Sequence, residues 1–145
     1  MEIRKPIPEE IQQIRRLSPQ ALSEGTLGKA EPNRDKVRQL VDPLLKKGCY
    51  YLIATEEERL AGWVLIGESK DSFTDRIIGF VYELYVLEHF RGRGISRKLM
   101  QEAVEQLKSL GYPEVRLSVY AGNHALHLYE SLGFAPRTIT MTLPL

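Results

Sequence analysis

A run of apolar residues, a turn made of glycine and arginine, and an amphipathic helix follow one another in the middle of the chain. Residues 77–87 are nearly all apolar, with β-branched and aromatic members, which predicts a strand buried on both faces. The turn reads Arg91-Gly92-Arg93-Gly94, and beyond it apolar residues recur with helical spacing over residues 95–110. A strand that turns tightly into a helix leaves backbone N–H groups unpaired at the positive end of the helix dipole. Such a junction can bind phosphate, so this stretch restricts both the fold and the ligand.

The flanking segments predict further strands and helices. Strands are expected at Ile3 and at residues 50–55, 60–66, 115–120 and 137–143, the last because Thr alternates there with Ile, Met and Leu. Helices are expected from Pro8, from Asn33 or Asp35, and over residues 123–132, while Pro43 should kink or end the second of them. Polar, Gly-rich and Pro-rich composition predicts loops at residues 18–34 and 67–76.

This order of elements predicts an α/β fold of the mixed α+β kind. The early strands pair antiparallel, and the turn at residues 56–59 makes a hairpin. The strand at 77–87, the helix and the strand at 115–120 form one crossover, which makes those two strands parallel. We expect a mostly antiparallel sheet with helices on both faces, within a single domain of residues 1–145.

Charge and composition exclude several classes of protein. The net charge of +1 argues against a nucleic-acid coat, so the basic turn is a local feature. The single cysteine, Cys49, rules out an internal disulfide and is expected to be a small buried hydrophobe. No apolar run approaches membrane-spanning length and no signal core follows Met1, so we expect a cytoplasmic protein with no membrane partner. His124 and His127 lack a third residue at ligand spacing, and no metal site is expected.

The glycine–arginine turn does not match the common nucleotide loops. The P-loop pattern G-x-x-x-x-G-K-[ST] is absent, and the dinucleotide pattern G-x-G-x-x-G fails because Arg97 stands at the third glycine. The stretch from Arg91 to Ser96 instead fits [QR]-x-x-G-x-[GA], with serine where glycine or alanine is usual. It resembles the acyl-coenzyme-A loop of the GNAT superfamily of N-acetyltransferases. The strand ending in Tyr82–Val86 and the run L-Y-E-S-L-G-F at 128–134 resemble the same family in order and spacing.

The resemblance implies acetyl-coenzyme A as co-substrate and a GNAT-like sheet whose parallel strand pair splays apart. The loop amides would hold the pyrophosphate, and arginine side chains would add charge. Backbone groups of the splayed strand would bond the pantetheine and the thioester oxygen, as an oxyanion hole does. An asparagine usually precedes the last helix, and here it lies one residue late. The implied cofactor-binding residues are Leu84, Tyr85, Val86, Arg91, Gly92, Arg93, Gly94, Ile95, Ser96, Arg97 and Asn123.

Two side chains are candidates for the chemistry. By resemblance Tyr129 is the general acid, since a phenol stays protonated at neutral pH; packing on an amphipathic helix is the alternative. Glu83 is the only charge between Ile77 and Leu87, and burial would raise its pKa toward that of a base. Strand alternation puts Glu83 on the face of Val81 and Tyr85; an ion pair with an arginine or a solvated edge position are the alternatives.

The predicted reaction is direct transfer of an acetyl group from acetyl-CoA to a primary amine in a ternary complex. The amine could belong to a small molecule or to a protein, with its binding surface at residues 18–34, the following helix and residues 56–76. One alternative is a non-catalytic acyl-CoA sensor or scaffold of the same fold. Another is nucleic-acid binding through residues 91–98, which the near-neutral charge disfavours. The alternating segment at 137–143 could pair across a homodimer.

Overall fold

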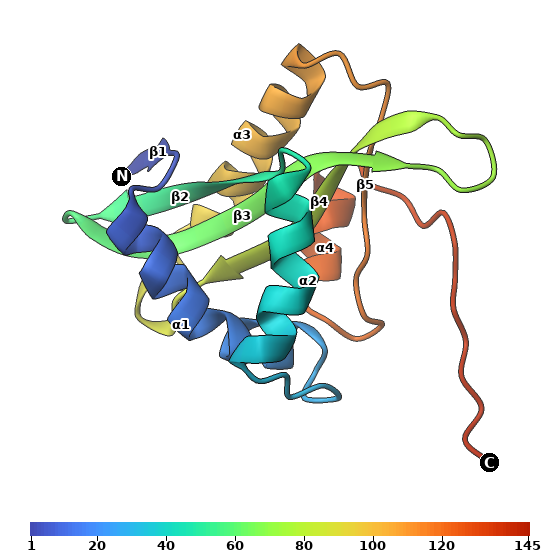
Figure 1. The fold of residues 1–145 in the computed structure, drawn as a ribbon, viewed down its shortest axis with the longest axis horizontal. Helices are drawn as coiled ribbons and strands as arrows, with labels where there is room; N and C mark the ends of the chain where they lie inside the picture. The colour runs from blue at the N-terminus through green and yellow to red at the C-terminus, as the bar shows by residue number, and fades with distance from the viewer.

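A five-stranded sheet forms the middle layer of the computed structural model, which describes residues 1–145 (Figure 1). The strands are β1 (Glu2–Arg4), β2 (Tyr50–Glu56), β3 (Arg59–Lys70), β4 (Ile77–Val86) and β5 (Val115–Leu117), and they lie side by side in that order. All neighbours are antiparallel except β4 and β5, which are parallel. The mixed, mostly antiparallel sheet expected from the sequence is therefore confirmed.

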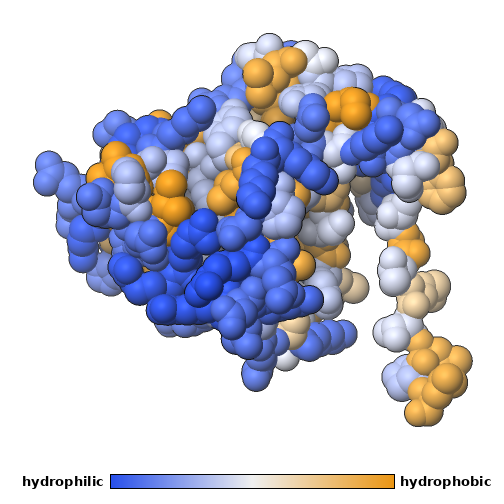
Figure 2. Space-filling model, in the orientation of Figure 1, coloured by the Kyte–Doolittle hydropathy of each residue, from blue (hydrophilic) through white to orange (hydrophobic).

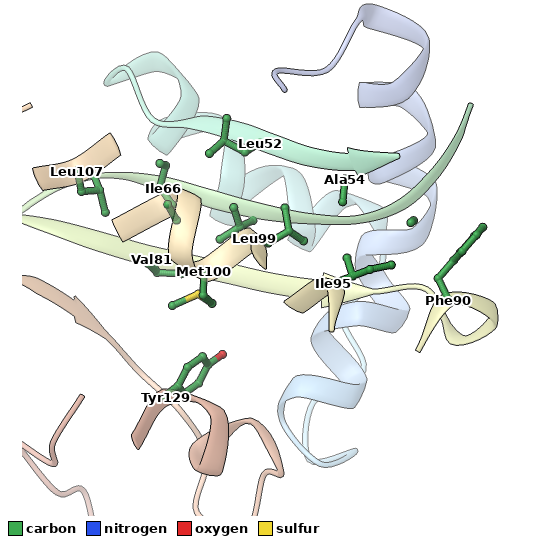
Figure 3. Packing of buried hydrophobic residues seen from close by; sticks show 13 residues of the cluster. Leu52, Ala54, Ile66, Val81, Phe90, Ile95, Leu99, Met100, Leu107 and Tyr129 are labelled. Atoms are coloured by element: carbon green, nitrogen blue, oxygen red, sulfur yellow. The ribbon is translucent and has the colours of Figure 1, made fainter. Parts of the chain in front are cut away.

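Helices cover both faces of the sheet (Figure 1). The helices α1 (Pro8–Gly25) and α2 (Arg34–Lys46) pack on one face over a cluster that includes Ile14, Val41 and Trp63. The helices α3 (Ile95–Ser109) and α4 (Ala125–Ser131) pack on the other face (Figure 3). A short 3-10 turn, η1 (Glu88–Phe90), joins β4 to the glycine–arginine turn. None of the helices is both long and apolar enough to traverse a lipid bilayer.

The first helix is longer than the sequence predicts. We expected a loop from residue 18, but α1 continues through Pro19 to Gly25. The hydroxyl of Ser18 donates to the carbonyl oxygen of Ile14 at 2.7 Å, and Ser18 and Ala21 are buried against the sheet. Burial of this face outweighs the backbone hydrogen bond that a proline removes from a helix interior. Similarly, α2 runs past Pro43 to Lys46, and Asn33 caps it by accepting from the backbone N–H of Lys36.

The pairs β2–β3 and β3–β4 are antiparallel, as the sequence predicts, but the strand and loop lengths differ from the prediction. The chain reverses at Glu57 and Glu58, whose φ values of 52° and 63° suit a two-residue hairpin turn. The strand β3 extends to Lys70, so the following loop spans only residues 71–76. Only the first half of β4 is largely buried, because its second half borders a cleft.

The expected last strand is absent. Residues 135–145 form neither helix nor strand, pair with no strand of the sheet, and have exposed side chains. Two shorter elements also end earlier than predicted: β5 stops at Leu117, and α4 covers only residues 125–131. The chain therefore leaves the sheet after Leu117, and this early exit shapes the site described next.

Candidate active site

A cleft opens where the two parallel strands part. They pair only over Gly79–Val81 and Val115–Leu117, after which β4 continues without a neighbour on that side. The cleft has a volume of about 840 Å³ and is walled by the second half of β4, the start of α3, residues 117–120 and part of α4. Residues 21–28, at the end of α1, close one side of it. Ligand sites in proteins commonly have volumes of roughly 300 to 1,000 Å³.

A β-bulge at Tyr82 decides which side chains of β4 face which layer. Glu83 stands opposite Leu65, but Val81 stands opposite Ile66, so Tyr82 is an extra residue in β4. Glu83 and Tyr85 therefore face the α1/α2 layer, whereas Val81 packs with the α3/α4 layer. Our expectation that Val81 shares the face of Glu83 was wrong, since simple alternation fails across a bulge.

The backbone of β4 directs polar groups into the cleft. The N–H of Leu87 donates to the carbonyl oxygen of Ala61 in β3 at 2.8 Å. Because successive N–H groups of a strand point to opposite sides, those of Val86 and Leu84 point away from β3 toward the cleft. The carbonyl oxygen of Val86 is also turned outward, where it accepts from Arg91 Nε at 2.9 Å. The side chains of Leu84 and Val86 pack against the α3/α4 core.

The glycine–arginine turn forms a cradle of donors at the start of α3. Gly92 and Gly94 have φ values of 79° and 75°, which side-chain-bearing residues adopt only with strain. The six N–H groups from Gly92 to Arg97 donate no hydrogen bond within the chain. A Cβ built on either glycine would meet no atom within 4 Å, so the space in front of the turn is open. Ile95 is buried in the core, and Ser96 lines the cleft.

The three arginines of this region have different surroundings. Arg91 lies against the ring of Tyr85 and forms an ion pair with Glu24 at 3.1 Å, so it ties β4 to α1. Arg93 lies over the ring of Phe90, and Arg97 donates to Ser131 Oγ at 2.8 Å. All three residues belong to or adjoin the cradle, so their positive charges favour an anion there.

Glu83 is held by one hydrogen bond. Its Oε1 accepts from the indole Nε1 of Trp63 at 3.0 Å, and no cation pairs with it. Burial raises the pKa of this carboxyl to about 7, while the bond from Trp63 acts in the opposite direction. The ion-pair alternative is thus not what the structure shows. A carboxyl that titrates near neutral pH at the wall of a cleft is suited to accept a proton.

Tyr129 lies on the opposite layer. Its side chain belongs to the α3/α4 core (Figure 3) and is 9% exposed. It packs edge-on against Phe134. The hydroxyl has no hydrogen-bond partner within the chain, and the residue lines the cleft. Burial raises the pKa of the phenol, so it is fully protonated at neutral pH. Tyr129 therefore both packs in the α3/α4 core and lines the cleft.

Asn123 connects the two ends of the site. Its Oδ1 accepts from the N–H of Ala125 at 2.9 Å, and its Nδ2 donates to the carbonyl oxygen of Gly25 at 3.1 Å. It therefore starts α4 and anchors the end of α1 beside the cleft. Residues 56–76, which we expected to contribute to an acceptor surface, do not line the cleft.

Sequence reasoning missed Trp63 and Glu24. Trp63 lies on β3 and meets Glu83 only through strand pairing, and Glu24 was assigned to a loop. The single weak signal was that Trp63 is the only tryptophan in the chain. An indole N–H that is buried needs an acceptor, but the sequence does not say which one.

A family model and curated proteins that resemble this chain are acetyltransferases. The model of the Acetyltransferase (GNAT) family matches residues 11–134. The uncharacterized N-acetyltransferase YjgM of Escherichia coli is 31% identical over 106 residues, which cover 72% of this chain and 60% of that protein. The [ribosomal protein bS18]-alanine N-acetyltransferase of Salmonella typhimurium is 31% identical over 86 residues, covering 59% and 54%. The chain thus spans less than two thirds of the length of these curated relatives.

Solved structures share the whole fold. A structure described as a putative acetyl transferase from Pyrococcus furiosus superposes with a TM-score of 0.79 over 99% of both chains, at 23% identity. Another, a ribosomal-protein-alanine N-acetyltransferase from Brucella melitensis, gives a TM-score of 0.74 over 92% of this chain and 83% of that one, at 20% identity. At these identities the likeness concerns the fold alone.

Proposed function

The chain belongs to the acetyltransferase (GNAT) family, and we propose that it transfers the acetyl group of acetyl-CoA to a primary amine. The transfer is direct: both substrates are bound together, and the amine nitrogen attacks the thioester carbon. One observation carries this proposal. Glu83 and Tyr129 lie on opposite layers of the sheet, and the gap between β4 and β5 is the cleft that both of them line.

The cradle at the start of α3 suits the diphosphate of the coenzyme. Six unpaired N–H groups and the positive end of a 15-residue helix converge there, beside open space. The outward N–H groups of Leu84 and Val86 suit the amide portion of the coenzyme and the thioester oxygen. Fixed donors of this kind stabilise the negative charge that develops on the oxygen during attack, because they need no reorganisation.

Glu83 prepares the acceptor. An amine is nucleophilic only when neutral, so its ammonium form must lose a proton before attack. A carboxylate with a pKa of about 7 accepts that proton, directly or through a water molecule; it is about half ionised at neutral pH and largely ionised at mildly alkaline pH. Its position on the α1/α2 layer supports binding of the acceptor amine on that side of the sheet.

Tyr129 completes the transfer. When the carbon–sulfur bond breaks, the departing thiolate takes up a proton, and the phenol is the available donor on the α3/α4 side. Its hydroxyl is free of other bonds and is protonated at neutral pH. The phenolate then regains a proton from solvent.

An assay of thiol release tests the proposal. The purified protein is incubated with acetyl-CoA and a panel of amines, and free coenzyme A thiol is measured. The panel contains peptides with an N-terminal alanine, which is the residue named for the Salmonella relative, together with lysine-containing peptides, amino sugars and polyamines. Acetylated product is identified by mass spectrometry.

Calorimetry separates the enzyme from a sensor of the same fold. We expect acetyl-CoA binding, thiol release with at least one amine, and loss of release in Tyr129→Phe with binding retained. Tight binding without turnover on any amine would favour the sensor. Absence of binding would reject both.

A further inference from the structure

The guanidinium group of Arg91 occupies a site for a cation that the protein itself provides. Its Nη2 donates to Glu24 Oε2 at 3.1 Å, and its Nε donates to the carbonyl oxygen of Val86 at 2.9 Å. Its Cζ lies 5.4 Å from the centre of the Tyr85 ring. A carboxylate, a carbonyl oxygen and an aromatic face are groups that bind an ammonium or a guanidinium ion. Together they form what we call the cation site.

The cation site keeps its shape without Arg91. Burial and the nearby carboxylate of Glu24 raise the pKa of the Tyr85 phenol to about 12, whereas Arg91 acts in the opposite direction, so the three groups are neighbours. Asn123 Nδ2 donates to the carbonyl oxygen of Gly25 at 3.1 Å and holds the end of α1 beside the cleft. This contact does not involve Arg91, so the Glu24 carboxylate stays at the cleft when the guanidinium leaves.

Coenzyme at the cradle competes with Glu24 for Arg91. Arg91 directly precedes the six unpaired N–H groups of the turn. The side chains of Arg91 and Glu24 are 45% and 42% exposed, and an ion pair so accessible to water contributes little. A diphosphate carries more negative charge than one carboxylate, and hydrogen bonds from a guanidinium to phosphate oxygens are strong. Coenzyme binding should therefore draw Arg91 from Glu24 and empty the cation site.

The cleft then presents more negative than positive charge to an acceptor. The acidic, basic and imidazole side chains that line it are Glu24, Glu83, Arg91 and His124. With Arg91 committed to the coenzyme, two carboxylates and one histidine remain. The outer face over α1 and α2 is also mostly hydrophilic (Figure 2), which suits a charged solute better than an apolar one.

The cation site and the proposed base are separated by the length of a short alkyl chain. Glu83 and Tyr85 share the α1/α2 face and lie two residues apart on β4. Because a strand rises by ~3.3 Å per residue, these two positions are ~7 Å apart. A chain of about five single bonds covers a similar length. One small molecule can therefore reach both sites.

We propose that the acceptor is a primary alkylamine with a second cationic group, such as an aliphatic diamine. This inference rests on the proposed acetyl transfer and names its substrate class. One nitrogen gives its proton to Glu83 and forms the amide bond as the carbon–sulfur bond breaks, and coenzyme A leaves as the thiol. The second ammonium binds where the guanidinium of Arg91 lies in the free protein. Glu24 is thus a specificity-determining residue.

Three acceptors of equal length test the substrate class. They are butylamine, 1,4-diaminobutane and 4-aminobutanoate, which carry no second charge, a positive one and a negative one. For the wild type, kcat/KM for 1,4-diaminobutane should exceed that for butylamine by roughly 10- to 100-fold, as expected for a hydrogen bond to a charged group. The acid 4-aminobutanoate should be a poorer acceptor than butylamine, because its carboxylate meets that of Glu24.

Glu24→Gln should abolish the preference for the diamine. The ratio of kcat/KM between 1,4-diaminobutane and butylamine should fall to within about threefold of one. Glu9→Gln is the matched control, because Glu9 is exposed in the first turn of the same helix and does not line the cleft. It removes the same charge and should keep the wild-type ratio. The ratio cancels any effect of either variant on coenzyme binding.

Calorimetry with coenzyme A, which has no acetyl group to transfer, tests the cation site without turnover. 1,4-Diaminobutane should bind at least ~5-fold more tightly to the coenzyme complex than to the free protein, because the coenzyme removes Arg91 from the site. This coupling should be absent in Glu24→Gln and retained in Glu9→Gln.

The outcomes separate this inference from the proposed function. Equal use of butylamine and 1,4-diaminobutane by the wild type would overturn the inference and leave acetyl transfer intact. A preference that survives Glu24→Gln would also overturn it, since another group would then bind the second cation. Diamine affinity that does not depend on coenzyme A would reject the exchange of Arg91. Absence of thiol release with every amine would reject the proposed function, and this inference with it.

Discussion

The indole of Trp63 in β3 donates a hydrogen bond to Glu83 in β4 across 3.0 Å. This bond is the only one that the Glu83 carboxyl makes within the chain, and it links a fully buried aromatic residue to the wall of the cleft. It fixes one oxygen of the carboxyl and leaves the other without a partner in the chain.

Glu83→Gln should remove most of the activity and should stabilise the fold at high pH. For the wild type, kcat/KM should rise with pH through an apparent pKa of about 7, because only the ionised carboxylate accepts a proton. Loss of a general base lowers kcat by roughly 10²- to 10⁴-fold. The raised pKa also means that the folded state binds more protons than the unfolded state between pH 4.5 and about 7.

Stability attributable to Glu83 therefore falls as pH rises through that window, by up to about 3 kcal/mol. Urea unfolding of wild type and Glu83→Gln at pH 5 and pH 8 measures the difference between them. A variant that gains nothing relative to wild type on going to pH 8 would contradict the burial of this carboxyl.

Trp63→Phe should shift the pH profile toward higher pH. The variant removes the N–H that favours the ionised carboxylate, so the pKa of Glu83 rises further. Catalysis at pH 9 should approach the wild-type rate, whereas the rate at pH 7 should fall several-fold. An unchanged midpoint of the kcat/KM profile would mean that this hydrogen bond has no influence on the base.

Tyr129→Phe should lower kcat by ~10²-fold or more and leave coenzyme affinity within about twofold. The hydroxyl has no partner in the chain, so its removal should change the free energy of unfolding by less than ~1 kcal/mol. Tyr112→Phe is the matched control, since that hydroxyl bonds Glu68 and Tyr112 does not line the cleft. Equal rates in the two variants would remove Tyr129 as the acid.

Gly94→Ala should weaken coenzyme binding by at least ~10-fold. A methyl group there meets no protein atom, so its effect on the ligand comes from filling the cradle. Gly111→Ala is the control, because Gly111 also has a positive φ and open space but lies at the far end of α3. Both variants bear similar backbone strain, and calorimetry should find reduced affinity only in Gly94→Ala.

Asp71→Asn should destabilise the end of the sheet near β5 and flatten the acid limb of the stability curve. Hydrogen bonds from Arg116 and from the N–H groups of Thr74 and Phe73 hold the pKa of Asp71 well below its usual range. Its contribution is therefore present above pH 4 and is lost as pH falls further. Thermal unfolding of both proteins between pH 2 and pH 7 should show a steeper acid decline in the wild type.

Local sequence was sufficient for the features that depend on neighbours in the chain. The glycine–arginine turn requires positive φ at Gly92 and Gly94 and precedes a helical repeat, so the cradle could be predicted before any contact was known. The hairpin at 57–58 and the parallel pairing of β4 with β5 follow from general rules of chain connection. For the cap of α2 the sequence offered Asn33 or Asp35, and the structure shows Asn33.

Features that depend on distant partners were predicted incorrectly or not at all. Pro19 favours a helix end on its own, and only the burial of Ser18 and Ala21 against the sheet keeps α1 intact. The bulge at Tyr82 turns Glu83 toward Trp63, and nothing in the local pattern of β4 signals it. The alternation at 137–143 is strand-like, but a strand forms only where a neighbouring strand is within reach.

The residues alone thus determined which backbone groups could hold an anion and in what order the elements are joined. Tertiary structure decided where the carboxyl of Glu83 and the hydroxyl of Tyr129 lie, which is on opposite layers of the sheet and along one cleft. The physical reason is the distance along the chain over which each effect acts. Dihedral preferences and helix dipoles act within a few residues, whereas burial, strand register and pKa depend on contacts that only the folded chain brings together.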